Sequence, residues 1–393
     1  MYLSHLSLSN FRNYKQLDLS LEPGLFFFYG DNAQGKTNLL EAVGMLATAN
    51  SFHASNDREI VHWQAPDHIA RLEGKVKRRE DEVELEIVIF DPTPPVIPNA
   101  PQTSRTFELP ANAPRKRFKV NGVPRKTMDL IGQMKVVMFA PTDLHLVDGP
   151  PDERRRFLDR ALCQVQPRYC QTLVKYRKTV SQRSALLKRV RDHQDDPRML
   201  DYLDELLTTQ ASLIIDERQR MVAALNEQAD QFQASISGGR EHLQIVYHPS
   251  FKGVEAEQIL EAPERYQAQL REIRRREIQQ GVCLLGPHRD DLEFLVNGIN
   301  ILTYGSRGQQ RTAALSAKLA ELGYMQASTG DEPLLLLDDV FSELDHSRRE
   351  YLLCQVLKHE QVLLTTTDLA GFPTETLQQA HLYHVVEGNI SRA

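Results

Sequence analysis

The stretch LFFFYGDNAQGKTNLLEAVGMLATA, residues 25–49, decides the fold. Leu25 to Tyr29 is a continuous apolar run, which is typical of a strand buried on both faces. After Thr37 the apolar residues recur with helical spacing. Between the two, residues 30–37 match the pattern G-x-x-x-x-G-K-[ST]. A glycine turn before an ordinary helix is the alternative, but the strand, loop and helix together predict a phosphate-binding loop in an α/β domain.

In such a loop the glycines let backbone N–H groups curl around phosphates, and the following helix adds the positive end of its dipole. We expect Lys36 to reach the β- and γ-phosphates of ATP and the Thr37 hydroxyl to ligate Mg²⁺. Lys36 is therefore also a candidate catalytic residue. The residues expected to bind the nucleotide here are Gly30, Asp31, Asn32, Ala33, Gln34, Gly35, Lys36, Thr37 and Asn38.

A second motif, LLLLDD at Leu334 to Asp339, is an apolar strand that ends in two acids. Asp338 is the candidate Mg²⁺ ligand, directly or through water, and Asp339 is the candidate general base or water-orienting carboxylate. Alone, the stretch is equally well a strand that ends in a turn. Because the same chain also carries a phosphate-binding loop, the catalytic interpretation is favoured.

A third motif, YGSRGQQR at residues 304–311, precedes the strongly helical stretch TAALSAKLAELGYM. Ser306 is a natural N-cap, and a hydroxyl with backbone N–H groups at a helix start makes an anion site. A simple capped helix is the other interpretation, and the two are balanced on this stretch alone.

The order of these motifs resembles that of ABC-type ATPase heads. In those proteins the S-x-G-Q signature of one subunit contacts the γ-phosphate held by the other. The resemblance implies that Ser306, Gly308 and Gln309 bind ATP from an opposing chain, with Ser306 in a catalytic role, and that ATP induces a homodimer. It also makes Ser342 to Asp345 a loop that crosses between subunits; unaided, these residues read as a helix-capping sequence.

The remaining patterns divide the chain. Alternating apolar residues at 3–21 predict a hairpin, LEGKV and VELEIVIF predict strands, and DPTPPVIPNAPQ at 91–102 predicts a loop. Residues 151–280 carry the spacing of long amphipathic helices, with Pro167 and Pro197 at helix starts. We therefore expect an α/β domain from residues 1–150 and 281–393, with residues 151–280 inserted as a short, mostly helical arm. The resemblance implies that the α/β domain is an ABC-type (SMC/Rad50-like) ATPase head.

The composition of the chain limits the kinds of partner and compartment that we expect. The net charge of −6 and a pI near 6.1 exclude a protein coated in basic charge, so any nucleic-acid contact requires a local patch. The four cysteines lack the spacing of a zinc or redox site and read as reduced, mainly buried thiols. The sequence shows no basic leader and no bilayer-length apolar run, which predicts a cytoplasmic protein without a membrane partner.

Further stretches bring a closer match. These are NFRNY at 10–14, GPPDERRRFLD at 149–159, GPHRDDLEF at 286–294 and LLLLDDVFSELD at 334–345. Together they resemble the RecF family, bacterial recombination-mediator ATPases related to the heads of SMC and Rad50 proteins. The resemblance implies ATP-dependent binding of double-stranded DNA and of single-strand/double-strand junctions. It also implies RecR as a partner, with RecO and RecA in the pathway.

The family motifs raise candidates outside the three core motifs. Arg12 and Asn13 of NFRNY are expected near the nucleotide. For His288 and Arg289 we favour a structural role, ion-paired with Asp290 or Asp291, over a place at the DNA or nucleotide surface. Three basic clusters either face phosphates or lie on solvated helix faces: residues 115–117, 154–156 and 274–276.

Departures from ABC transporters predict slow hydrolysis. Phe139-Ala140-Pro141 lacks the Q-loop glutamine, and Thr367 lies where a switch histidine would be. Asp339 replaces a glutamate, and a carboxylate shorter by one methylene must move to hold the attacking water. His53 stands where the family commonly has arginine. Two alternatives remain open: an ABC transporter ATP-binding subunit, and a structural clamp held by ATP without hydrolysis.

Overall fold

The computed structural model describes residues 1–54, 56–91, 115–251 and 263–392. Its contacts divide the chain into two compact units, Met1–Pro141 with Met325–Ala393, and Thr142–Tyr324. The first is called unit 1 and the second unit 2. The Pro-rich loop predicted at 91–102 lies, apart from Asp91, outside the described residues.

One sheet of unit 1 is antiparallel, with strand order β2-β1-β4-β5-β6-β7. Its strands are β1 (Tyr2–Phe11), β2 (Tyr14–Ser20), β4 (Ile69–Lys77), β5 (Glu82–Phe90), β6 (Lys116–Val120) and β7 (Val123–Arg125). The alternating apolar residues predicted the β1–β2 hairpin correctly, because leucines such as Leu6 and Leu8 are fully buried on one face. The turn of this hairpin is formed by Arg12 and Asn13, between the paired residues Phe11 and Tyr14.

The second sheet of unit 1 has the order β15-β14-β3-β13-β12-β8 and is parallel except for its edge strand β15. Its strands are β3 (Gly24–Tyr29), β8 (Val136–Phe139), β12 (Leu334–Asp338), β13 (Gln361–Thr366), β14 (His381–Val386) and β15 (Asn389–Arg392). Phe26 and Phe28 of β3 are buried in the main core, while Phe27 meets Phe372 edge to face. Burial on both faces explains why β3 is continuously apolar.

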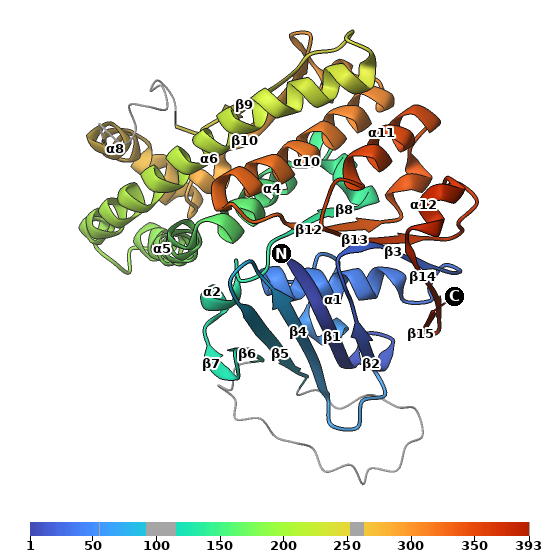
Figure 1. Cartoon of the computed structure of the whole chain (residues 1–393). Coiled ribbons are helices and arrows are strands. Elements are labelled where there is room, and N and C mark those ends of the chain that lie inside the picture. Colours follow the sequence, from blue (N-terminus) through green and yellow to red (C-terminus); the bar gives the residue numbers. More distant parts are fainter. Residues whose placement is uncertain (55, 92–114, 252–262, 393) are drawn as a thin grey trace. The chain divides into compact units, whose positions relative to one another are not determined.

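Helix α1 (Lys36–Thr48) runs between the two sheets of unit 1 (Figure 1). It contacts strands of both sheets and is buried almost all round, which explains its apolar character on every face. The remaining helices of this unit are η1 (Asp57–Ile60), α2 (Thr127–Leu130), η5 (Val340–Glu343), α11 (His346–Val356) and α12 (Thr374–Gln378). Sheet, loop and helix thus bring the start of α1 to the carboxyl ends of β3 and β12.

Unit 2 is mostly helical. Its described helices are most of η2 (Pro141–Leu144), α3 (His145–Asp148), α4 (Pro151–Val165), α5 (Pro167–Arg191), η3 (Pro197–Met199), α6 (Leu200–Ser237), α8 (Pro263–Gln280), η4 (Pro287–Arg289), α9 (Ile301–Tyr304) and most of α10 (Arg307–Thr329). Pro167 and Pro197 open their helices as predicted, since proline fits a first turn. With 38 residues, α6 is about 57 Å long. Within the described ranges, no helix is both long and apolar enough to cross a bilayer.

The boundaries of unit 2 differ from those expected for the arm, 151–280. A small antiparallel sheet explains most of the difference, because β9 (Leu243–His248) pairs with β10 (Asp291–Val296), and β10 pairs with β11 (Ile299–Asn300). The first part of α10 also joins this unit, where the Ser316 hydroxyl donates to Gln233 Oε1 at 3.1 Å. Residues 142–150 and 281–324 therefore belong with the helices rather than with the head.

Candidate nucleotide site

The phosphate-binding loop has the backbone that its sequence predicted. Gly30 and Gly35 have φ of 146° and 111°, values that side-chain-bearing residues rarely adopt, and Ala33 is left-handed at 65°. Lys36 Nζ donates to the carbonyl oxygens of Gly30 at 2.5 Å and Asp31 at 2.7 Å. Burial lowers the pKa of Lys36, and the charges of Asp339 and Asp338 oppose that shift. The lysine is therefore held over the loop, where a phosphate can replace the two carbonyls.

The β1–β2 turn packs against the phosphate-binding loop and holds it by hydrogen bonds. Asn13 Nδ2 donates to the Gln34 carbonyl at 2.9 Å, and Asn38 Nδ2 donates to Asn13 Oδ1 at 2.8 Å. The Tyr14 hydroxyl donates to the Gly35 carbonyl at 3.0 Å. A Cβ on Gly35 would stand 2.5 Å from Asn13 Nδ2, so only glycine fits there. The structure places Asn13 and Asn38 at the loop, while their contact with nucleotide stays a prediction.

Arg12, the other turn residue, is bound by a buried carboxylate. Its guanidinium donates to both oxygens of Glu41 at 2.7 Å and to the Glu59 carbonyl at 2.7 Å. The hydrogen bond to Glu41 raises the pKa of Arg12. Ser51 also donates to Glu41, and its Oγ accepts the N–H of His53 at 2.9 Å. Glu41 thus ties the hairpin turn to the segment that carries His53, whose side chain is exposed.

The magnesium ligands predicted from two distant motifs lie in contact. Thr37 Oγ1 donates to Asp338 Oδ1 at 2.8 Å, although the two residues are 301 positions apart in the chain. Thr365 Oγ1 donates to the same carboxylate oxygen at 2.7 Å. A hydroxyl and a carboxylate are oxygen donors of the kind that Mg²⁺ takes. The pair therefore fits the ion, with Thr365 orienting the acid.

Asp339 follows at the end of β12 in a left-handed conformation, with φ of 48°. Its N–H lies 3.1 Å from Thr365 Oγ1 and 3.2 Å from the Thr365 carbonyl oxygen, which fixes this strained backbone. Burial raises the pKa of Asp339, and the charge of Asp338 adds to the rise, while the nearby Ser342 hydroxyl and the charge of Lys36 oppose it. A carboxylate with a raised pKa is a stronger base, as the predicted role of Asp339 requires.

The segment after Asp339 has the capping role that its sequence suggested. Asp345 Oδ1 accepts the N–H of Arg348 at 3.0 Å, so Asp345 is the N-cap of α11. The Ser342 hydroxyl donates to the Asp339 carbonyl at 2.7 Å. The role of residues 342–345 between subunits stays a prediction.

The signature motif lies in unit 2, at the start of α10. Gln309 N–H donates to Ser306 Oγ at 3.2 Å and Ser306 N–H donates to Gln309 Oε1 at 3.0 Å, which is a capping box. Gln309 Nε2 also donates to Glu241 Oε1 at 3.1 Å. Ser306 is exposed, so its hydroxyl is accessible to a ligand. The capped-helix interpretation is confirmed, and nucleotide binding by Ser306, Gly308 and Gln309 stays a prediction.

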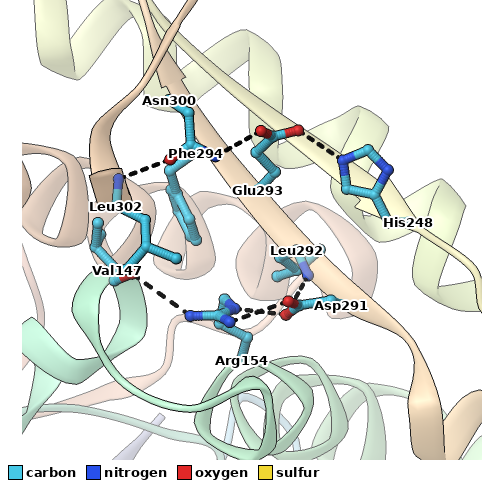
Figure 2. Close-up of a pocket in the computed structure, with 9 residues that line it drawn as sticks. All are labelled: Val147, Arg154, His248, Asp291, Leu292, Glu293, Phe294, Asn300 and Leu302. Atoms are coloured by element: carbon cyan, nitrogen blue, oxygen red, sulfur yellow. Dashed lines mark hydrogen bonds and ion pairs between the residues drawn. The ribbon is translucent and has the colours of Figure 1, made fainter. Parts of the chain in front are cut away.

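A pocket of about 240 Å³ lies beside the segment that leads to this motif (Figure 2). Glu293 accepts hydrogen bonds from Asn300 Nδ2 at 2.6 Å and His248 Nε2 at 2.7 Å, and these bonds lower the pKa of Glu293. Asn300 Oδ1 accepts the Leu302 N–H at 2.9 Å and so caps α9. These contacts hold the turn that precedes Ser306.

The basic clusters are largely engaged in intrachain pairs. Arg154 is buried and donates to both oxygens of Asp291 at 2.6 and 3.0 Å. Arg274 donates to Asp201 at 2.5 Å and Asp204 at 2.6 Å. Lys116 pairs with Asp57 at 2.7 Å, and Arg117 stacks over Phe90 at 5.0 Å. The contacts of these four residues are therefore structural.

His288 and Arg289 contact a backbone carbonyl rather than the predicted partners Asp290 and Asp291, so the predicted pairing was wrong. A place at the DNA or nucleotide surface stays the alternative, since the Arg289 side chain is exposed. Arg289 NH2 donates to the Cys283 carbonyl at 3.1 Å, and His288 contacts the same carbonyl at 3.2 Å. Asp291 instead pairs with Arg154, and Asp290 lies 3.6 Å from Arg218. Arg154 and Arg218 belong to α4 and α6, which are distant in sequence from GPHRDD. The two aspartates therefore pair outside their own motif.

Sequence reasoning missed four supports of the site: Tyr14 and the β14–β15 turn at the loop, Glu41 at the β1–β2 turn, and Thr365 at Asp338. In that turn the N–H groups of Glu387 and Gly388 donate to the side chain and carbonyl of Gln34 at 2.7 and 3.0 Å. Tyr14 was within NFRNY, and Thr365 ends an apolar strand with a polar run, which is a signal for an active edge of a parallel sheet. Glu41 and the turn carried no local signal.

Comparison with known proteins supplies the context for this geometry. The family described as RecF/RecN/SMC N terminal domain matches residues 2–385. The DNA replication and repair protein RecF of Chloroflexus aurantiacus is 42% identical over 401 aligned residues, covering 99% of each chain. The protein of the same name from Halalkalibacterium halodurans is 39% identical and both chains are covered in full, at 100%.

Solved structures agree. Two are described as the recombination mediator protein RecF in the RecFOR pathway, one with ATP and one with ATPrS. Each is 30% identical with a TM-score of 0.85, covering 100% of this chain and 97% or 98% of the other. An Smc head domain from Pyrococcus furiosus is 14% identical with a TM-score of 0.52, covering 100% of this chain and 96% of that one, and shares the fold.

Proposed function

The chain belongs to the RecF family of DNA replication and repair proteins, and we propose that it is an ATP-dependent DNA-binding protein of recombinational repair. The observation that carries the proposal is the contact between Thr37 and Asp338, which joins the phosphate-binding loop to the acidic end of β12. Relatives described as bound to ATP support the same nucleotide. A transporter subunit is not favoured, because the relatives match this chain over its whole length.

In this proposal the loop N–H groups and Lys36 bind the phosphates of ATP, and Thr37 and Asp338 hold Mg²⁺. The ion, when bound, neutralises charge on the β- and γ-phosphates. Asp339 orients a water molecule toward the γ-phosphate and takes its proton. The short aspartate side chain makes hydrolysis slow, so ATP turnover times the release of DNA.

The proposed assembly is a homodimer induced by ATP, in which Ser306, Gly308 and Gln309 of one chain meet the phosphate loop of the other. Hydrolysis removes these contacts and reopens the dimer. The proposed DNA ligands are double-stranded DNA and single-strand/double-strand junctions. RecR is the proposed direct partner, with RecO and RecA in the pathway; the relatives described within the RecFOR pathway support this assignment.

Retention of labelled duplex DNA tests the proposal. The wild-type protein with Mg²⁺ and ATP should bind DNA more tightly than without nucleotide and should sediment as a dimer. Lys36→Arg should lose both effects, because a planar guanidinium does not replace a compact ammonium over the loop. Lys358→Arg makes the same exchange at an exposed residue of unit 1 and should behave as wild type. If ATP neither dimerises the wild type nor strengthens its DNA binding, the proposal fails.

A further inference from the structure

Two sequence motifs that the nucleotide site does not use meet in a second pocket of unit 2, with a volume of about 230 Å³. Residues of GPPDERRRFLD and GPHRDD line it together with residues of α5 and α6. Four of the lining residues are arginines: Arg155, Arg156, Arg177 and Arg218. Two aspartates, Asp152 and Asp159, stand against them in the wall.

The deepest arginine, Arg218, is structural. Its NH2 donates to Asp159 Oδ1 at 2.8 Å, its NH1 to the Pro287 carbonyl at 2.8 Å and its Nε to the Tyr169 hydroxyl at 3.1 Å. Only 2% of its side chain is exposed. The buried carboxylates of Asp159 and Asp290 compensate the charge of Arg218, which leaves ligand contacts to the outer arginines.

The two outermost arginines are accessible. Arg156 and Arg177 have 55% and 62% of their side chains exposed, and each is paired with one carboxylate, Glu153 at 2.6 Å and Asp159 at 2.9 Å. The Arg156–Glu153 pair is exposed and contributes little to stability, whereas only 9% of the Asp159 side chain is exposed and Arg218 binds it as well. A guanidinium has five N–H donors, so each of these two arginines keeps donors beyond its pair. Both side chains can therefore bind an additional anion.

Arg155 is intermediate in exposure, with 17% of its side chain exposed. Its NH1 donates to the Asp290 carbonyl at 2.6 Å, which fixes the guanidinium, while NH2 contacts Asp152. The Asp152 side chain is 63% exposed and lies at the start of α4. An incoming anion can displace this carboxylate into solvent and take its place on Arg155.

The aromatic wall of the pocket is neutral. His288 Nε2–H donates to the Cys283 carbonyl at 3.2 Å, so its Nδ1 accepts from the Tyr176 hydroxyl at 2.6 Å. Burial lowers the pKa of His288 to about 4, which keeps the ring uncharged at neutral pH. The charges of the pocket wall therefore come from its four arginines and two aspartates.

We propose that this pocket binds a phosphate group through Arg155, Arg156 and Arg177. The fork of N–H donors on each guanidinium matches phosphate oxygens, and guanidinium groups from two helices surround a tetrahedral anion better than a planar carboxylate. Resting on the proposed function, the phosphate is a phosphodiester of the bound DNA. Free inorganic pyrophosphate is the other source of the same chemistry.

Salt-dependent DNA titration tests the pocket with three matched variants in the full chain. With a non-hydrolysable ATP analogue present, Arg156→Gln and Arg177→Gln should each weaken binding of a fluorescent duplex about tenfold. Each should also reduce the slope of log K against log salt by about one. Arg220→Gln removes an exposed arginine of α6, 66% accessible and paired with Asp216, and should leave both quantities unchanged.

A calorimetric titration with pyrophosphate, in the presence of saturating Mg²⁺-ADP to fill the phosphate loop, separates the two sources. Loss of pyrophosphate binding in Arg177→Gln with unchanged DNA affinity supports a site for a free phosphate compound. Unchanged DNA affinity, salt slope and pyrophosphate binding in both pocket variants overturn the proposal. If wild type binds no DNA at all, the proposed function fails, and the pyrophosphate titration alone decides whether the pocket is a phosphate site.

Discussion

The charged form of Asp339 is the one that the proposed catalysis uses, but it lowers the stability of the folded chain. Because burial raises its pKa in the folded chain, the stability that this group contributes is present below the unfolded-state pKa and is lost as the pH rises through the higher folded value. At neutral pH the wild type therefore holds a charged carboxylate that its surroundings disfavour. Asp339→Asn should remove turnover, keep ATP binding and raise the melting temperature.

The pH dependence checks this assignment. The difference in melting temperature between Asp339→Asn and wild type should be largest near neutrality and should shrink as acid protonates Asp339. Asp368→Asn changes an exposed aspartate of unit 1 and provides the control. Normal ATP turnover in Asp339→Asn would remove Asp339 from the mechanism.

Thr365 is predicted to govern the affinity for Mg²⁺ through Asp338. Its hydroxyl donates to the carboxylate oxygen that also accepts from Thr37, so Thr365→Val frees the acid to rotate while it keeps the side-chain shape. Loss of such a supporting hydrogen bond typically weakens a metal site about 10–100-fold. The Mg²⁺ concentration that half-saturates ATP binding should rise accordingly.

The neighbouring threonine provides the control for this substitution. Thr366 is buried like Thr365, but its hydroxyl donates to the Asp368 carbonyl at 2.8 Å. Thr366→Val should therefore leave the Mg²⁺ requirement unchanged. If both variants raised the Mg²⁺ requirement equally, the cause would be a general change in β13 and not the orientation of Asp338.

Among the elements, α5, α6 and α8 are joined by one buried arginine. Arg183 donates to Asp204 Oδ1 and to Glu277 Oε2, each at 2.6 Å, and Arg183 and Glu277 have no exposed side-chain surface. Arg183→Leu leaves Glu277 as a buried charge without its cation, which should cost about 3–5 kcal/mol of unfolding free energy.

Urea denaturation followed by circular dichroism measures this loss, because the helices of unit 2 dominate the signal. Arg220→Leu breaks an exposed pair within α6, with Asp216 at 3.0 Å, and should cost no more than about 0.5 kcal/mol. Similar losses in the two variants would show that the buried cluster does not hold the three helices together.

Over the whole molecule, the sequence predicted the helices and strands that depend on neighbouring residues. The apolar run before Gly30 and the helical spacing after Lys36 identified β3 and α1, and Pro167 marked the start of α5. Strand pairing between residues far apart in the chain could not be predicted from the sequence. The extent of unit 2 depends on the β9–β10 pairing. The contact of Thr365 with Asp338 depends on the parallel register of β12 and β13, in which these two residues are direct partners.

Completion of the site by a second copy can be tested by mixing two inactive variants. Lys36→Ala removes the phosphate-binding lysine in unit 1, and Ser306→Arg fills the start of α10 in unit 2 with a bulky cation. If the two halves act in different chains, a mixed dimer carries one intact pairing, Lys36 from one chain and Ser306 from the other. The mixture should hydrolyse ATP while neither variant does alone. If the mixture stays inactive although sedimentation shows mixed dimers in the presence of ATP, Ser306 serves the site of its own chain, and the proposed assembly is wrong.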